Sequence, residues 1–295
     1  MLLSVGSLSA QYVDVPRNEQ TVAEKQLIAA YDGHQYALVV TLGSKALLSM
    51  SDRRHRAFLL AYRASAYRHL GQLEKALSDG GEALRLNPKT PFAHAGRAGV
   101  HEARGEIDLA IAEYTGEIEL NPRYLPAYTN RGHWYRKGGE FNKAIADFHM
   151  AVRIDPNDPD AFAELAVIYY VRGEHENALT NLREATARIN RSTDERTLAL
   201  VAWFLATCPD ARFRNGKTAV QLARQSCELK EWKHYGSLDA LAAAYAECGD
   251  FERAVKFEKQ ALAARSVTKQ DRQEIEKHFQ LFQERKPYRD QFLAQ

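Results

Sequence analysis

The sequence has few cysteines, no excess of one charge and no long hydrophobic run. Its three cysteines, Cys208, Cys227 and Cys248, are too few to build a disulfide framework across 295 residues. Its 40 basic and 38 acidic residues nearly cancel and are interspersed, which argues against a basic nucleic-acid-binding arm or an acidic tail. The longest apolar run, residues 198–206, is about half as long as a membrane-spanning helix. We therefore expect neither a membrane span nor a nucleic-acid partner.

The first 20 residues do not decide the compartment. They begin with an apolar stretch and contain a small-x-small triplet at residues 7–9, as a signal-peptide cleavage region would. They also lack a positively charged start, and their apolar core is short. Residues 1–20 are thus either an ordinary tail or a signal-peptide remnant, and the sequence is equally compatible with a cytoplasmic and an exported, periplasmic location.

A 34-residue period organises the middle of the chain. Four glycines and four alanines recur at this spacing, namely Gly71, Gly105, Gly139 and Gly173 together with Ala76, Ala110, Ala144 and Ala178. In residues 57–90 the pattern predicts a first helix that ends near His69, because Gly71 then occupies a position that favours positive φ. A second helix is predicted from about Gln72 to Asn87, where Pro88 ends it. One helical hairpin cannot bury both its faces, so we expect hairpins to stack into an all-α repeat.

The segment 127–158 carries the signature of a known helical repeat. The matching residues are Tyr128, Gly132, Tyr135, Gly139, Phe141, Ala144, Phe148, Ala151 and Pro156. The chain therefore resembles the tetratricopeptide repeat family, which implies an α-solenoid, a right-handed superhelix of about six to seven hairpins with a C-terminal capping helix. The stretches LATCPD, RNGK and LAAAYAE further resemble a tetratricopeptide module at the C-terminus of multidomain bacterial proteins. That resemblance implies a bacterial origin and a role in assembly.

These patterns suggest the following division of the chain. After the tail at 1–20 come a degenerate first repeat at 21–56, four repeats at 57–90, 91–124, 125–158 and 159–192, two divergent hairpins over 193–268, and a capping helix with a tail over 269–295. In the capping helix, predicted over 269–286, we expect Ile275, Phe279 and Phe282 to form the apolar stripe.

Residues 211–218, ARFRNGKT, spell the end of a phosphate-binding loop. Gly216, Lys217 and Thr218 follow that motif, but Ala211 replaces its first glycine and no strand pattern precedes it. We interpret the segment as an elongated turn between two helices, with Asn215 as the N-cap of the second helix. No nucleotide or other cofactor is expected.

No catalytic or metal-binding constellation is predicted. His94 and His101 occupy aromatic core positions of the repeat, which favours packing over metal binding. The chain lacks H-E-x-x-H and G-x-S-x-G motifs, and its carboxylates are expected on solvated helix faces without paired spacing. Cys208 and Cys227 are either buried small residues or, in an exported protein, a disulfide. We therefore predict that the protein is not an enzyme.

The family resemblance assigns the concave groove to the first helix of each repeat. The groove residues predicted in this way are Tyr62, Ser65, Arg68 and His69, then Asn130, His133, Arg136 and Lys137, and finally Glu164 and Tyr170. The small residues Ala95, Gly96 and Gly99 predict a recess between the basic groups. A peptide with acidic and apolar side chains could be held there by charge-assisted hydrogen bonds. The alternative is that the basic residues are only a solvated helix face.

The predicted function is a non-catalytic protein-interaction scaffold that binds a protein or peptide in this groove, with self-association as a further option. One alternative is an accessory or regulatory subunit of a bacterial enzyme or secretion assembly. An RNA-binding helical repeat is less favoured, because it would need a continuous basic face. A chaperone adaptor is also disfavoured, since only Asn130 matches the carboxylate clamp that the resemblance would require.

Overall fold

The computed structural model describes residues 21–90, 92–264 and 267–290, and these form helices without any strand, as predicted. The helices are α1 (Val22–Asp32), α2 (Tyr36–Ser49), α3 (Arg53–His69), α4 (Leu73–Leu86), α5 (Ala93–Ala103), α6 (Ile107–Leu120), α7 (Leu125–Lys137), α8 (Phe141–Ile154), α9 (Pro159–Val171), α10 (His175–Arg188), α11 (Glu195–Thr207), η2 (Ala211–Phe213), α12 (Gly216–Leu229), α13 (Tyr235–Glu247), α14 (Phe251–Ala263) and α15 (Lys269–Gln283). The predicted tail at 1–20, Pro91 and the last five residues lie outside the described residues. Within the described ranges no helix is both long and apolar enough to cross a membrane.

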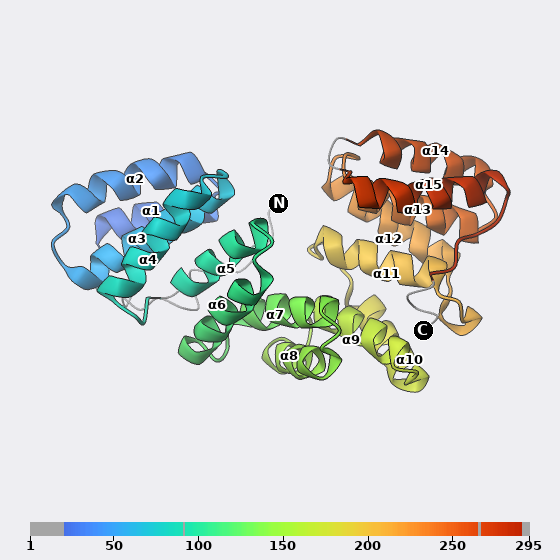
Figure 1. Cartoon of the computed structure of the whole chain (residues 1–295), viewed down its shortest axis with the longest axis horizontal. Coiled ribbons are helices and arrows are strands. Elements are labelled where there is room, and N and C mark those ends of the chain that lie inside the picture. The colour runs from blue at the N-terminus through green and yellow to red at the C-terminus, as the bar shows by residue number, and fades with distance from the viewer. Residues whose placement is uncertain (1–20, 91, 265–266, 291–295) are drawn as a thin grey trace. The chain divides into compact units, whose positions relative to one another are not determined.

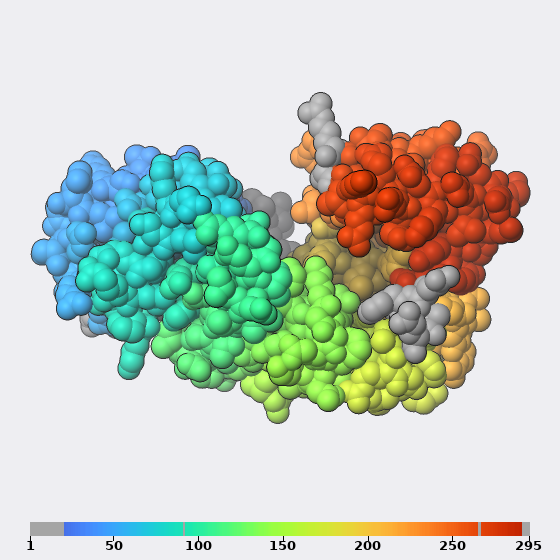
Figure 2. Space-filling view, in the orientation of Figure 1, coloured from blue at the N-terminus to red at the C-terminus, as the bar shows by residue number. Residues whose placement is uncertain are grey.

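The helices pack in consecutive pairs inside two compact units, residues 1–154 and 155–295. In the first unit the pairs are α1 with α2, α3 with α4, α5 with α6 and α7 with α8 (Figure 1). In the second unit α9 pairs with α10, α11 with α12 and α13 with α14, while α15 packs mainly on α14. Within each unit, side chains fill the gaps between the ribbons (Figure 2). This arrangement is the stacked-hairpin α-solenoid expected from the period.

Glycines in the left-handed conformation make the turns inside the hairpins. Gly71, Gly105, Gly139 and Gly173 have φ between 71° and 75°, where a side chain would be strained. After α3 ends at His69, as predicted, the amide of Gly71 donates to the Arg68 carbonyl and that of Gln72 to the Tyr67 carbonyl. These two bonds satisfy carbonyls at the helix end. The glycine period in the sequence is therefore a period of helix-ending turns.

Ion pairs that recur every 34 residues join the paired helices of the first unit. The sequence interpretation missed this second period. The pairs are Arg63 with Asp79, Arg97 with Glu113 and Arg131 with Asp147. Arg131 donates to both carboxylate oxygens of Asp147, over 2.9 and 2.7 Å, and its third nitrogen donates to Thr115 Oγ1 of the preceding hairpin (2.9 Å). Arginine suits this role because its planar fork matches a carboxylate. Each such arginine thus holds a hairpin closed, and Arg131 also ties it to its neighbour.

The expectation that carboxylates lie on solvated helix faces is wrong for a substantial group of them. The side chains of Asp79, Asp147, Asp160, Glu24, Glu117, Glu164 and Glu258 are buried. Glu117 accepts hydrogen bonds from the Ala95 amide (3.2 Å) and the Asn121 side chain (2.5 Å), while burial raises its pKa. The repeat pattern did not reveal this burial. A carboxylate can take the place of a buried apolar residue where hydrogen-bond donors satisfy its oxygens, as they do at Glu117.

The elongated turn between α11 and α12 confirms the interpretation of ARFRNGKT. Asn215 is the N-cap of α12, and its side chain accepts from the Thr218 amide (3.1 Å). A Cβ at Gly216 would lie 2.7 Å from Cys248 Sγ, so glycine permits close contact with the end of α13 rather than with a phosphate. Cys208 and Cys227 are buried free thiols.

The apolar stripe of α15 differs from its prediction by one residue. Ile275, His278 and Phe282 are buried, whereas Phe279 is only partly buried. His278 packs against the rings of Trp203 and Tyr288. Residues three and four positions along a helix share one face, so the sequence favoured the more apolar phenylalanine, whereas the packed fold buries the histidine.

Candidate functional site

A pocket of about 180 Å³ opens in the first unit among α1, α3, α5, α6 and α7. Its lining residues are Tyr31, Ala61, Tyr62, Ser65, Arg68, Phe92, Ala95, Gly96, Gly99, Glu102, Tyr114, Tyr124, Pro126 and Asn130. The recess expected from Ala95, Gly96 and Gly99 is therefore part of this pocket. A Cβ at Gly96 would contact nothing within 4 Å, whereas one at Gly99 would lie 2.9 Å from Arg68 Cδ. Gly96 thus borders open space, and Gly99 makes room for the arginine.

A row of four aromatic rings forms much of the wall. Tyr31 and Tyr62 meet edge to face with their centroids 5.3 Å apart, and Phe92 follows 6.3 Å from Tyr62. Tyr124 completes the row, 5.5 Å from Phe92. Phe92 has a φ of 62°, which is rare for an aromatic residue and costs conformational energy. The strained backbone therefore places a ring in the middle of the pocket wall.

Arg68 supplies the positive charge of the pocket. Its Nη2 donates to His69 Nε2 (2.9 Å), and its buried Nε has no hydrogen-bond acceptor among the described residues. His69 stacks on Tyr36, with centroids 4.0 Å apart, and burial together with Arg68 and His34 lowers the pKa of His69 to about 4. Because His69 is then neutral near pH 7, and neither Arg136 nor Lys137 lines the pocket, Arg68 is the basic side chain of the lining.

Glu102 contributes the opposite charge to the lining. Its carboxylate accepts from Trp134 Nε1 and forms a hydrogen bond with the Tyr114 hydroxyl. The pKa of Tyr114 is raised by burial first and by Glu102 second, so its hydroxyl keeps its proton. The pocket therefore combines an apolar aromatic wall with one cation, one anion and the amide of Asn130.

Only four of the ten predicted groove residues line this pocket: Tyr62, Ser65, Arg68 and Asn130. On α7, His133 and Arg136 are partly buried, and the ammonium of exposed Lys137 lies 4.7 Å from the centre of the Trp134 ring.

Glu164 and Tyr170 belong to the second unit, where both are buried. Tyr170 packs against Phe204 and Phe213. The neighbouring Asp160 accepts a hydrogen bond from Arg196 (2.9 Å). The two groove residues predicted in this unit thus lie in its packed interior. The positions carried over from the family could not show this, because Phe213 comes from a turn more than 40 residues further along the chain.

The sequence interpretation missed seven of the lining residues: Tyr31, Ala61, Phe92, Glu102, Tyr114, Tyr124 and Pro126. The four aromatic residues of the row recur at intervals of 30 to 32 residues, a signal present in the sequence but out of step with the 34-residue period. Phe92 and Tyr124 directly precede α5 and α7 as N-cap residues, which explains the altered spacing.

Comparison with known proteins identifies the repeat. A sequence profile described as TPR repeat matches residues 132–171, and one described as tetratricopeptide repeat matches residues 236–267. No curated protein matches the sequence.

Three solved structures illustrate the likeness of fold. The Cut9-Hcn1 hetero-tetramer of the APC/C aligns with a TM-score of 0.68 at 15% identity, over 87% of this chain and 48% of that chain. A tetratricopeptide repeat protein from Parabacteroides merdae aligns with a TM-score of 0.58 at 16% identity, over 89% of this chain and 100% of that one. The C-terminal part of a TPR repeat-containing protein from Cytophaga hutchinsonii gives 0.50 at 18% identity, over 84% and 97%.

The chain thus spans about half the length of the Cut9-Hcn1 chain that it matches. At these identities the likeness concerns the fold. The two profile matches, the left-handed glycine turns and the stacked helical hairpins agree with one another, and the chain contains tetratricopeptide repeats.

Proposed function

We propose that this protein is a non-catalytic interaction scaffold whose first unit binds a partner segment by taking one bulky apolar side chain into the aromatic pocket. The pocket volume supports this proposal. At about 180 Å³ it is close to an engineered cavity of about 150 Å³ that holds benzene, and it is smaller than the roughly 300–1,000 Å³ typical of small-molecule sites. One phenylalanine- or leucine-sized side chain fits that space better than a cofactor does.

The polar lining suggests how the rest of the segment is oriented. The Arg68 guanidinium suits an acidic side chain of the partner, because charge-assisted hydrogen bonds to carboxylates are strong. The Asn130 amide can both donate to and accept from a peptide main chain. The preferred partner is therefore a segment with an apolar anchor and a nearby Asp or Glu.

The lining favours binding over catalysis. Ser65 is the serine of the pocket lining. Its Oγ lies 2.6 Å from the Tyr31 hydroxyl and not beside a histidine or carboxylate base. Nucleophilic catalysis by serine requires such a base within hydrogen-bond reach. The tetratricopeptide fold, in which stacked hairpins present extended surfaces for binding, points the same way.

A peptide-display selection with a pocket-filling variant tests the proposal. Gly96→Leu adds a side chain where a Cβ meets open space, and Gly81→Leu makes the same change in α4 at another open helical position outside the lining. Wild type and Gly81→Leu should enrich the same peptides, sharing one bulky apolar residue and a nearby acid. Gly96→Leu should not enrich them. Enrichment of the same peptides by all three proteins, or of none by wild type, would contradict the proposal.

A further inference from the structure

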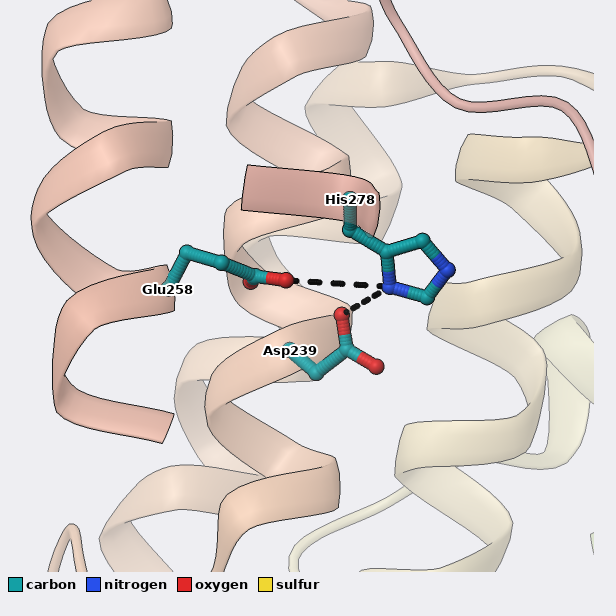
Figure 3. A group of neighbouring side chains, drawn as sticks. All are labelled: Asp239, Glu258 and His278. Carbon is teal, nitrogen blue, oxygen red and sulfur yellow. Dashed lines mark hydrogen bonds and ion pairs between the residues drawn. The ribbon is translucent and has the colours of Figure 1, made fainter. Parts of the chain in front are cut away.

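Three ligand-type side chains from three helices converge in the second unit. Asp239 of α13, Glu258 of α14 and His278 of α15 point toward one another (Figure 3). His278 Nδ1 lies 3.0 Å from Asp239 Oδ1 and 3.6 Å from Glu258 Oε1. One donor atom from each residue lies within 4.8 Å of the other two. The cluster therefore has the dimensions of a small coordination site.

The two carboxylates replace apolar or small residues of the repeat. Tyr245, Gly249 and Ala254 correspond to Tyr135, Gly139 and Ala144 of the standard repeat, which fixes the register. In that register Asp239 corresponds to Ala61, Ala95, Thr129 and Ala163, and Glu258 corresponds to Gly80, Tyr114, Phe148 and Leu182. The fold itself does not require an acid at either position, so the pair calls for a separate explanation.

Glu258 differs from the buried Glu117 and Glu24 in lacking hydrogen-bond donors. It is fully buried, and neither carboxylate oxygen has a hydrogen-bond partner within the described part of the chain. Glu117, equally buried, receives two hydrogen bonds, and Glu24 receives them from Thr21 as well as from His55. An unsatisfied buried carboxylate is costly. The Glu258 oxygens face His278 and Asp239, which is where a cation would satisfy them.

The cluster also lacks a basic counter-charge. Among the described residues no lysine or arginine forms an ion pair with Asp239 or Glu258. A divalent cation at this place would supply the missing positive charge.

We propose that Asp239, Glu258 and His278 bind one divalent transition-metal ion, with Zn²⁺ the best match. One imidazole and two carboxylates suit Zn²⁺ better than the all-oxygen sites that Ca²⁺ and Mg²⁺ prefer. Tetrahedral zinc with bonds of about 2.0–2.1 Å places its donors roughly 3.3 Å apart, between the two Nδ1 distances in the cluster. The Asp239 side chain is 15% exposed, which leaves a side on which water can complete the coordination.

Such an ion would cross-link the last three helices of the unit. The donors come from both helices of the final hairpin and from α15, which packs on that hairpin. Metal binding should therefore hold α15 in place, because ligand binding to the folded state stabilises the helices that supply the ligands.

The first test is a calorimetric titration of the full-length, chelator-treated protein with ZnCl₂. Wild type should bind one equivalent, and Glu258→Gln should weaken binding by about tenfold or more. Gln is the isostere of the protonated carboxyl, so the fold should persist, as circular dichroism can check. Glu24→Gln is the matched control, because Glu24 is also fully buried beside a histidine, His55 at 2.9 Å, but has no second carboxylate in a metal-sized cluster. This control should bind as wild type does.

A second test uses wild type alone and does not depend on the variants. One equivalent of ZnCl₂ should shift the imidazole ¹⁵N resonance of His278 Nδ1 selectively among the ten histidines. The absence of saturable binding, equal binding by Glu258→Gln, or a shift at other histidines instead would overturn the proposal. The cluster would then be a self-contained hydrogen-bonded pair of His278 and Asp239 beside the buried Glu258.

Discussion

The two units build the same hairpin but differ at one interhelical position. In the first unit, ion pairs join the two helices of a hairpin at this position, namely Arg63 with Asp79, Arg97 with Glu113 and Arg131 with Asp147. The corresponding positions in the second unit carry Leu165 with Asn181 in one hairpin and Leu241 with Phe257 in another. Leu165 and Leu241 are buried. The comparison teaches that this interhelical position accepts a charged pair, a leucine with asparagine, or an apolar pair, so that no buried charge is left without a partner.

Breaking one charged pair should give the largest effect. We expect Arg131→Leu to lower the free energy of unfolding by about 3 kcal/mol, because Asp147 stays buried without its partner. Arg131→Leu with Asp147→Leu, which imitates the apolar solution of the second unit, should recover most of that loss. Urea unfolding of both variants measures the difference. If the double variant is as unstable as the single one, a charged and an apolar pair are not interchangeable at this interhelical position.

The stability of the two units should also depend on pH in different ways. Asp158 of the second unit should have a larger effect than His69 of the first unit. Burial and the charges of Asp160, Asp155 and Asp194 raise the pKa of Asp158 from 3.8 to about 6, against the opposing effect of the Asp160 amide. The folded state then binds more protons than the unfolded state between these values. Stability of the second unit should therefore fall by about 1–2 kcal/mol as pH rises from 4 to 6.

Asp158→Asn tests this pH dependence directly. Asparagine can still cap α9 but has no charge to lose, so thermal unfolding of this variant should lack that part of the decline between pH 4 and 6. A wild-type and a variant curve that run parallel over this range would show that Asp158 does not cause the decline.

Filling open helical glycines should have a smaller effect, and of the opposite sign. Gly81 in α4 and Gly96 in α5 both border open space, so alanine at either position should raise stability by about 0.5–1 kcal/mol through helix propensity. Thermal unfolding of the two single variants provides the measurement. Destabilisation by Gly96→Ala alone would mean that the pocket is tighter than its geometry indicates.

The smallest expected effect belongs to His69. Its pKa is lowered to about 4, so the unfolded state binds more protons between this value and about 6.5, and stability is lost as pH falls through that window. The partial exposure of the ring keeps the loss small. His69→Gln should remove it, as the difference between unfolding midpoints at pH 7 and pH 5 would reveal. An unchanged difference would contradict a neutral His69 in the folded protein.

The sequence predicted the repeating parts of the fold better than the parts that break the repeat. Gly71 and its counterparts were predicted because a left-handed turn needs a particular residue. Arg131 and Asp147 were equally periodic, but their pairing becomes evident only when the two helices face each other. Phe92 lay out of register because an N-cap position, rather than a helical one, presents its ring.

The candidate sites were predictable to a smaller extent. The small residues of α5 predicted the recess because small side chains leave space wherever the helix packs. Glu258 gave no periodic signal, since its two neighbours in the cluster come from helices that are adjacent only in the fold. Tyr170 matched a groove position, yet Phe213 from a distant turn covers it. Contacts between distant segments therefore decided the sites, and one sequence alone does not display them.

The equilibrium affinity of one display-selected peptide for wild type, Gly96→Leu and Gly81→Leu tests the central claim most directly. The account predicts that Gly96→Leu, with the pocket filled, binds at least about tenfold more weakly, since a buried anchor dominates such interfaces. Gly81→Leu should bind as wild type does. Equal affinities for all three proteins would contradict the claim, because the partner would then bind outside the aromatic pocket.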